Sequence, residues 1–415
     1  SKSSGMRAVR CFEEGRRFAR IGSVSSCFVK LVNKRMIYAD HAATTALSER
    51  ALAAALPFFR ENYGNASSAY SFGKQARKAV ERAREQVACA VGAHAAEIVF
   101  TAGGSEGNNT VLRGVVEESR QQGKSVHIVV SAMEHPSILM TCRALEKCGA
   151  AVSYLPVSWA GRVSSVSVIG ALRTDTRLVS VMLANNEVGT VQDIAEIASV
   201  LEGCGIPFHT DAVQAVGHIP VDVRELGVTY LTASGHKFYG MKGTGFLYQK
   251  AGAELPTLIA GGGQERGLRA GTENTAGIVA LGEALTESCE CMADEAVRLH
   301  GLVSCTVQEI RENLPEIRVH GEGGGHLPGL VNIGVPGVRG ESLVHLLDLK
   351  GICVSAASAC NAGADVPSHV LLAMGYSEKE AMEALRISYG RETTGQDADD
   401  VVRAIVEAVG KIRGL

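Results

Sequence analysis

The sequence lacks three features that would each assign it to a particular class of protein. It has no run of about eighteen apolar residues, so no segment is expected to span a membrane. It has no basic excess, and a formal net charge of −3 argues against a dedicated nucleic-acid binder. It has no C-x-x-C pair, so neither a zinc knuckle nor a thioredoxin-like redox motif is supported, and we expect no metal site.

The eleven cysteines are odd in number and scattered along the chain. Such a distribution suits a reducing compartment, where most cysteines are small buried hydrophobic residues. We therefore expect a cytoplasmic protein in which most cysteines are structural. A cysteine with a chemical role must be distinguished from the others by its own surroundings.

The first 35 residues differ from the rest of the chain. They carry nine Lys or Arg against two Glu, a local charge of +7, and they precede Met36. A basic leader is typical of organelle import, whereas the opening Ser-Lys-Ser-Ser-Gly resembles a remnant of cloning and Met36 would serve equally as a natural start. We therefore treat residues 1–35 as an extension outside the fold.

What the sequence does contain is the pattern of an α/β protein. At 415 residues and 46% hydrophobic content, the chain is long enough for roughly two to three domains. From Ala51 onwards, amphipathic helical patterns alternate with short apolar runs, which predicts a mostly parallel sheet covered by helices on both faces. Strands are expected at 97–101, 126–131, 152–155, 178–184, 207–210 and 230–233, and helices at 74–91, 136–148, 193–204 and 275 to about 313.

Two glycine-rich loops, at 261–271 and 321–329, flank the last of these helices. Residues 330–415 then show a shorter strand and helix pattern, which predicts a smaller α/β unit. We therefore expect a large domain over 49–293 and a small domain formed by 36–48 and 294–415.

Two residues that follow predicted strands indicate a cofactor. Lys237 lies among small and aromatic residues, which lower the solvation and the pKa of its amine and make it a nucleophile toward an aldehyde. Asp211 ends the preceding strand, and ligands of such sheets bind outside the carboxyl ends of the strands. Pyridoxal 5′-phosphate (PLP) needs a lysine to carry it and an acid to keep its pyridine nitrogen protonated. Without this context, Lys237 is an ordinary surface lysine and Asp211 a helix N-cap.

Other polar residues near the strand ends fit the same cofactor. Gly103-Gly104-Ser105 offers backbone N–H groups at a helix start, where a phosphate binds, although Gly-Gly-Ser is also common in turns. Ser234 and His236 are further donors. His135 is either a structural histidine or a ring that stacks on the pyridine and transfers protons. Gln214 either completes a helix cap or bonds the phenolic oxygen of the cofactor.

Six ordered blocks carry a family resemblance. They are T-A-G-G-S-E-G-N-N, M-E-H-P, A-N-N-E-V-G-T-V-Q-D, T-D-A-V-Q, S-G-H-K-F-Y-G-M-K-G-T-G and G-G-G-Q-E-R-G-L-R-A-G-T. In this order and approximate spacing, they resemble the NifS/IscS-like cysteine desulfurases of the class V aminotransferase group. The resemblance starts at Tyr38 and runs to the end of the chain. It implies the PLP-dependent transferase fold-type I, with a mostly parallel seven-stranded sheet in the large domain and a smaller α/β domain.

The resemblance also implies roles for individual residues. Lys237 would carry PLP, Asp211 would pair with its pyridine nitrogen, and His135 would stack on its ring. The phosphate would be held by Gly104, Ser105, Ser234 and His236, and the phenolic oxygen side would be contacted by Gln214 and Asn186. Thr272 would reach the phosphate of the other subunit, which implies a homodimer with shared active sites. Arg386, together with Asn186, would bind the carboxylate of L-cysteine, and an arginine fork suits a carboxylate geometrically.

Cys360 is the residue that would make this site a desulfurase. Its surroundings, residues 355–368, are small and polar, which suits an exposed loop where a thiol can ionise and attack sulfur. By resemblance, Cys360 would take the sulfur of L-cysteine as a persulfide, releasing L-alanine. An acceptor protein, such as an iron–sulfur scaffold or a tRNA-modification enzyme, would then receive the sulfur for iron–sulfur cluster or thio-cofactor biosynthesis.

Some positions depart from the family pattern. Tyr70 replaces a usual histidine, Ala356-Ala357 replaces a common Ser-Gly, and Asn361-Ala-Gly follows the cysteine. The first departure would alter a substrate-pocket or dimer contact, and the other two concern the loop and leave the sulfur acceptor open. Selenocysteine lyase is the nearest alternative function, followed by a related PLP aminotransferase or lyase in which Cys360 is incidental, and by an inactive scaffold.

Overall fold

The computed structural model describes residues 35–253, 255–356 and 366–414. Residues Ile37–Leu415 form one compact unit, and the fold below is that of this unit. Cys360 and its neighbours at 357–365 lie outside the described residues.

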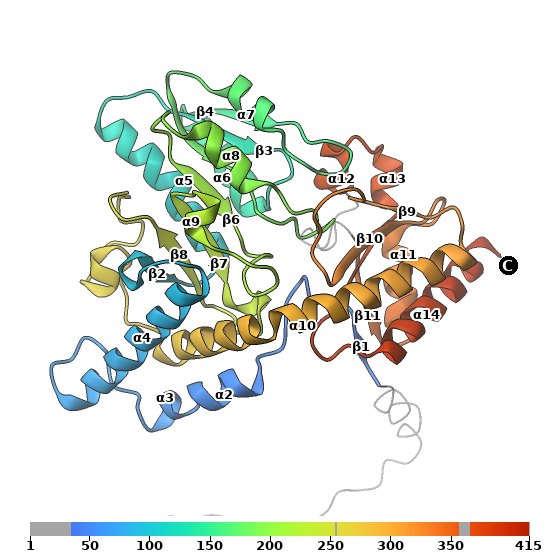
Figure 1. Ribbon diagram of the computed structural model, residues 1–415, viewed down its shortest axis with the longest axis horizontal. Coiled ribbons are helices and arrows are strands. Elements are labelled where there is room, and N and C mark those ends of the chain that lie inside the picture. The colour runs from blue at the N-terminus through green and yellow to red at the C-terminus, as the bar shows by residue number, and fades with distance from the viewer. Residues whose placement is uncertain (1–34, 254, 357–365, 415) are drawn as a thin grey trace, which may run out of the picture. The chain divides into compact units, whose positions relative to one another are not determined.

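A seven-stranded sheet organises the first part of the unit (Figure 1). Its order is β2-β8-β7-β6-β5-β3-β4 in the described chain, and every neighbouring pair is parallel except the two that involve β8. The strands are β2 (Ile98–Thr101), β3 (His127–Ser131), β4 (Ala151–Leu155), β5 (Thr176–Ser180), β6 (Phe208–Asp211), β7 (Tyr230–Ser234) and β8 (Gly245–Gln249). The predicted seven-stranded, mostly parallel sheet is confirmed.

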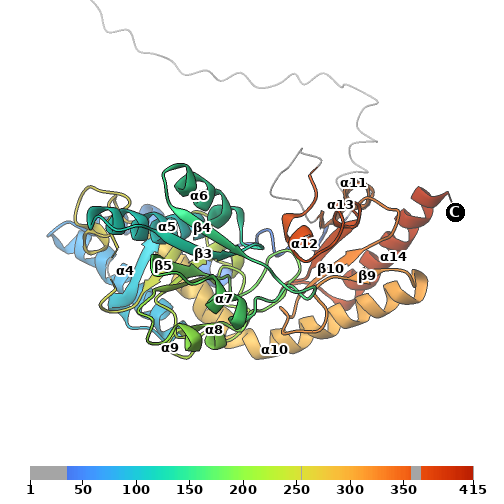
Figure 2. The same ribbon diagram turned by 90° about the horizontal axis from the view of Figure 1, so that it is seen from above.

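Helices cover both faces of this sheet, as Figure 2 shows from above. The helices of this part are α2 (Glu49–Ala55), α3 (Pro57–Arg60), α4 (Ser71–Ala90), α5 (Gly104–Gln121), α6 (Pro136–Lys147), α7 (Ser165–Ala171), α8 (Ile194–Leu201) and α9 (Val223–Leu226). Helices α5 and α6 pack on one face, whereas α4, α7, α8, α9 and the long α10 (Thr275–Asn313) pack on the other. The predicted helix from 275 to about 313 is therefore confirmed.

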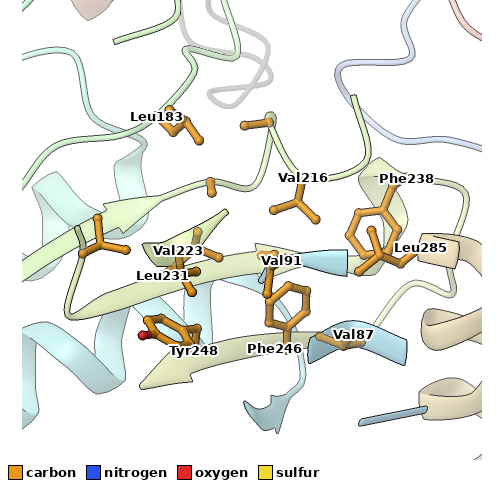
Figure 3. Close-up of a cluster of buried hydrophobic side chains, with 14 of the residues drawn as sticks. Val87, Val91, Leu183, Val216, Val223, Leu231, Phe238, Phe246, Tyr248 and Leu285 are labelled. Atoms are coloured by element: carbon orange, nitrogen blue, oxygen red, sulfur yellow. The ribbon is translucent and has the colours of Figure 1, made fainter. Parts of the chain in front are cut away.

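The strands are buried on both faces because their side chains alternate between two cores. On β7, Tyr230 packs toward α5 and α6, whereas Leu231 packs into the opposite core. On β8, Leu247 joins the first core and Phe246 the second. Figure 3 shows the second core, which contains Leu231, Phe246 and Val87 of α4. Burial of this kind explains why β2 and β3 are mostly apolar runs in the sequence.

Two smaller sheets belong to the rest of the unit. One pairs β1 (Ile37–Tyr38) with β11 (Ile352–Cys353), and the other has the order β12-β13-β10-β9 in the described residues. The remaining elements are β9 (Arg318–Val319), β10 (Leu330–Gly334), α11 (Gly340–Asp348), β12 (Ser355–Ala356), α12 (His369–Ala373), α13 (Glu378–Met382), β13 (Ala384–Ser388) and α14 (Gly395–Arg413). Helix α10 contributes Leu285 to the large-sheet core and Ile310 to the core of this part. The domain boundaries at 48/49 and 293/294 stay a prediction.

Two expectations from the sequence need correction. The strand predicted at 178–184 ends at Ser180, although Val181 and Leu183 still donate backbone hydrogen bonds toward the β6 segment. The cysteines are also less buried than predicted: of those in the described chain, Cys142 is buried, whereas Cys89, Cys148, Cys204 and Cys305 are exposed. Small size lets a cysteine occupy exposed helical positions at little cost, so scatter through apolar stretches did not indicate burial.

One buried histidine predicts the behaviour of the fold in acid. His209 on β6 is fully buried between Ser180 Oγ and Thr232 Oγ1, and burial lowers its pKa from 6.5 to about 3. Below pH 6.5 the unfolded chain therefore binds a proton that the folded chain excludes. We expect His209 alone to lower the free energy of unfolding by about 2 kcal/mol between pH 6.5 and 5.

Urea unfolding of the wild type and His209→Asn across this pH range measures the effect. The variant should be less stable at neutral pH but should show a flatter decline toward pH 5. His345→Asn, at an exposed position of α11, is the control and should keep the wild-type decline. An identical slope in His209→Asn and the wild type would contradict the assignment.

Candidate functional site

A cavity of about 330 Å³ lies at the carboxyl ends of the central strands. It is lined by residues that follow β5, β6 and β7, by the first turn of α5, by the start of α6, and by two segments from the smaller sheets. The lining residues are Ala42, Ala43, Gly104, Ser105, Asn108, His135, Ser137, Met182, Asn186, Asp211, Val213, Gln214, Ser234, His236, Lys237 and Arg386. Of the predicted site residues in the described chain, the fold thus brings together all except Thr272.

Lys237 supplies the amine of the cavity. It ends a short helical turn, Gly235–Lys237, directly after β7. Its Nζ donates hydrogen bonds to the carbonyl oxygens of Ala42 at 2.5 Å and Ala43 at 2.8 Å. The chain segment just after β1 therefore fixes the position of the amine, although it is almost 200 residues away in the sequence.

Asp211 supplies a buried carboxylate at the end of β6. It is 3% exposed, its Oδ2 accepts from Asn108 Nδ2 at 2.6 Å, and its Oδ1 accepts from Val213 N at 3.0 Å. The bond to the residue two positions on forms a turn and not a helix cap, so the N-cap alternative is wrong. Each oxygen retains a lone pair for a further donor.

Asn108 is a site residue that the sequence interpretation missed. It lies on α5, is 1% exposed, and its Nδ2 donates to both Asp211 and Ser137 Oγ. Its Oδ1 is buried without a hydrogen-bond partner in the described chain. A signal was available, because Asn108 lies four residues after Gly104, on the same face of the helix.

His135 makes a structural contact and also faces the cavity, whereas its stacking and proton-transfer role stays a prediction. As the N-cap of α6 it accepts a bond from Ser137 N through Nδ1 at 3.1 Å, and its ring also lines the cavity. Burial lowers the pKa of His135, and the nearby charge of Lys237 adds to this effect, against the opposing influence of Asp211. The ring is therefore neutral at pH 7, with its proton on Nε2 because Nδ1 is an acceptor.

One end of the cavity has the donors that a phosphate requires. Helix α5 begins at Gly104 without a side-chain cap, so the N–H groups of its first turn are free to bind an anion. Gly103 has φ +149°, and a Cβ on Gly104 would lie 2.6 Å from Val213 Cγ2, so both positions require glycine. Ser234 and His236 line the same cavity, and burial lowers the pKa of His236 to about 4.

Arg386 supplies a cation from β13 and is 4% exposed. Its Nη2 is 2.7 Å from Asp40 Oδ1, and its Nη1 donates to the carbonyl oxygen of Asn186 at 2.8 Å. Gln214 donates through Nε2 to the carbonyl oxygen of Ala42 at 2.9 Å, and it does not complete a helix cap at Asp211. The cation and the amine therefore line the same cavity from opposite parts of the fold.

Two positions that the sequence singled out lie away from the cavity, and a third is not described. Thr272 is exposed and does not line the cavity. Tyr70 is 61% exposed at the N-terminus of α4, so the departure there does not change this cavity. Cys360 lies outside the described residues, so its role stays a prediction.

Two broader features concern only the described ranges. In them, no group of three or more His, Cys, Asp or Glu side chains is arranged to hold a metal ion. Over the same ranges, every helix is too short or too polar to cross a bilayer.

Sequence comparisons show similarity to known proteins over most of this chain. The model of the aminotransferase class-V family matches residues 37–401. A cysteine desulfurase IscS of Clostridium botulinum (strain Hall) is 43% identical over 92% of this chain and 96% of its own length. A cysteine desulfurase of Rattus norvegicus is 40% identical over 92% of this chain and 84% of its own length.

Solved structures agree with this relationship. A NifS-like protein superposes with a TM-score of 0.85 at 35% identity, over 91% of this chain and all of that chain. SspA in complex with cysteine superposes with a TM-score of 0.75 at 36% identity, over 85% of this chain and 98% of that one. With a family match across nearly all of the described residues and relatives at 40–43% identity, the chain belongs to the aminotransferase class-V family.

Proposed function

We propose that this protein is a PLP-dependent cysteine desulfurase, which converts L-cysteine to L-alanine and passes the sulfur to Cys360. The observation that carries the proposal is the composition of one cavity. It holds an amine at Lys237, a buried carboxylate at Asp211, a neutral ring at His135 and a cation at Arg386. Relatives named cysteine desulfurase support the choice of substrate.

The residues present fit PLP. The open N-terminus of α5, with Ser105, Ser234 and His236, would hold the phosphate. Asp211 would accept a hydrogen bond from the protonated pyridine nitrogen and so keep it protonated, and Asn108 would keep that carboxylate in place. When bound, PLP supplies an electron sink for the α-carbon of an amino acid.

The remaining chemistry belongs to the side chains of this protein. Arg386 would bind the substrate carboxylate through its fork of N–H groups. Lys237 Nζ would remove and return the proton on the substrate α-carbon, as a positioned general base. His135, neutral at pH 7, would stack without placing a second positive charge beside Lys237. Cys360, as a thiolate, would attack the substrate sulfur. The bond between that sulfur and the β-carbon would break with its electron pair going to the β-carbon, which takes up a proton, so that a persulfide stays on Cys360 and L-alanine leaves.

The proposal includes a homodimer and a sulfur-acceptor protein such as an iron–sulfur scaffold. Thr272 is exposed and follows the glycine-rich loop at 261–271, which supports a contact with the phosphate of a second subunit. The compartment is proposed to be the cytoplasm.

One combined measurement tests the proposed function. The purified protein should show the absorbance of bound PLP near 420 nm. With an added thiol that reduces the persulfide, it should release sulfide and L-alanine in equal amounts from L-cysteine, since one carbon–sulfur bond is broken per turnover. Turnover of L-selenocysteine with almost none of L-cysteine would favour a selenocysteine lyase. Dependence on a keto acid would indicate an aminotransferase, and a colourless protein would indicate an inactive scaffold.

A further inference from the structure

Asp40 lies behind Arg386 at the edge of the cavity. It follows β1 by two residues, and its backbone forms a parallel bridge with Ser388, two residues beyond Arg386 on β13. Asp40 itself does not line the cavity, whereas Arg386 does. The two side chains are only 16% and 5% exposed, so water screens their attraction weakly.

Both oxygens of the Asp40 carboxylate are engaged. Oδ1 is 2.7 Å from Arg386 Nη2, and Oδ2 accepts a hydrogen bond from Ser355 Oγ at 3.0 Å. Ser355 lies on β12 directly opposite Arg386 in the strand register. The carboxylate therefore cannot rotate without losing one of these two bonds, so Asp40 holds Nη2 in one direction.

The other nitrogen at the tip of Arg386 is held from the large sheet, because Nη1 donates to the carbonyl oxygen of Asn186. A guanidinium group has five N–H bonds, and these two contacts use only two of them. The guanidinium plane is thus fixed at two points, and the remaining N–H groups are left for a ligand. Nε is one of them, since it has no hydrogen-bond partner in the described chain.

The segment that carries Asp40 also positions the amine of the site. Ala43 lies three positions after Asp40, and the carbonyl oxygens of Ala42 and Ala43 accept the bonds from Lys237 Nζ. A single short segment therefore sets where the cation and the amine lie relative to each other. An α-amino acid needs that relation, because its carboxylate and its reacting α-hydrogen sit on the same carbon atom.

We propose that Asp40 is a positioning residue, which acts through Arg386 to aim its fork at the carboxylate of an α-amino acid in the cavity. This inference rests on the proposed function, since it takes Arg386 as the carboxylate-binding residue. Asp40 could instead act only as a counter-ion that weakens the positive charge of Arg386. The two roles predict opposite changes in the affinity for a carboxylate when Asp40 is removed. Loss of a positioning residue weakens carboxylate binding, whereas loss of a counter-ion strengthens it.

The test compares two ligands that differ by the carboxylate. L-Alanine and ethylamine are titrated into the PLP-loaded protein, and binding is followed by the visible absorbance of the cofactor. Asp40→Ala removes the charge-assisted bond that holds Arg386 Nη2. It should therefore weaken L-alanine binding by roughly tenfold or more. It should leave the binding of ethylamine, which has no carboxylate, nearly unchanged. The KM for L-cysteine should rise by a similar factor, with a smaller change in kcat.

Two further variants keep the test decisive if Asp40→Ala folds poorly. Asp40→Asn retains an acceptor for Arg386 and should recover part of the lost discrimination between the ligands. Ser355→Ala frees the carboxylate to rotate and should reduce that discrimination roughly two- to fivefold, since it removes one of two restraints. Asp193→Ala, at the exposed N-cap of α8 away from the cavity, is the control and should bind both ligands as the wild type does.

Three outcomes would overturn the inference. Tighter L-alanine binding in Asp40→Ala would make Asp40 a counter-ion, and equal weakening of both ligands would make its role structural. A wild-type protein that binds L-alanine and ethylamine equally would remove Arg386 from the carboxylate site. Absence of L-cysteine turnover in a wild type that still discriminates the two ligands would instead overturn the proposed function and leave the role of Asp40 standing.

Discussion

Lys237→Ala should abolish L-cysteine turnover, with a loss of at least about a thousandfold, and should eliminate the PLP absorbance near 420 nm after dialysis. The amine has two functions in the proposed mechanism, because it anchors the cofactor and moves the α-proton. No other lysine lines the cavity in the described chain, so no neighbour can substitute. Absorbance spectra and a sulfide assay measure both losses.

A neighbouring lysine provides the control for this variant. Lys242 is exposed, lies five residues further along the chain and does not line the cavity. Lys242→Ala should therefore keep the spectrum and the rate of the wild type. Retention of the 420 nm band in dialysed Lys237→Ala would show that another group carries the cofactor.

Cys360→Ala is expected to block sulfur transfer and to leave cofactor binding intact. Sulfide release and persulfide formation should fall by at least about a thousandfold, because only a thiolate attacks the substrate sulfur. The PLP absorbance should persist, since none of the residues proposed to hold the cofactor is changed. Mass spectrometry of the protein after exposure to L-cysteine should show a gain of one sulfur atom in the wild type and no gain in the variant.

Several other cysteines of the described chain are exposed, so controls are needed. Cys305 is exposed on α10, whereas Cys353 is half-buried on β11, where burial and the nearby Asp348 raise its pKa. Cys305→Ala and Cys353→Ala should both retain turnover. Undiminished turnover in Cys360→Ala, or its loss in either control, would show that the sulfur follows another route.

The strand and helix pattern predicted the large sheet well because its strands are buried on both faces. Such strands are rich in apolar residues. Helix α10 was predicted at 275 to about 313 from a different signal, the recurrence of apolar positions at helical spacing. The end of β5 was the weak point. The chain stays apolar and buried from Val181 to Leu183, so hydrophobicity alone does not show where regular pairing stops.

The candidate site was predictable where its residues follow strands. Lys237, Asp211 and His135 lie just beyond or at the ends of β7, β6 and β3, where a parallel sheet gathers its ligands. Asn108 and Asp40 were missed because they act on other side chains and not on a ligand. Their partners, Asp211 and Arg386, are distant in the sequence.

The sequence by itself determined the fold class, the mostly parallel sheet, the family resemblance and most of the residues that line the cavity. These depend on local periodicity and on motifs that a chain carries without folding. Only the tertiary structure decided that the carbonyl oxygens of Ala42 and Ala43 hold Lys237, and that Asp40 and Asn186 hold Arg386. Such contacts join segments that lie about two hundred or more residues apart in the sequence. Their geometry exists only once the large sheet and the smaller sheets have packed together with α10.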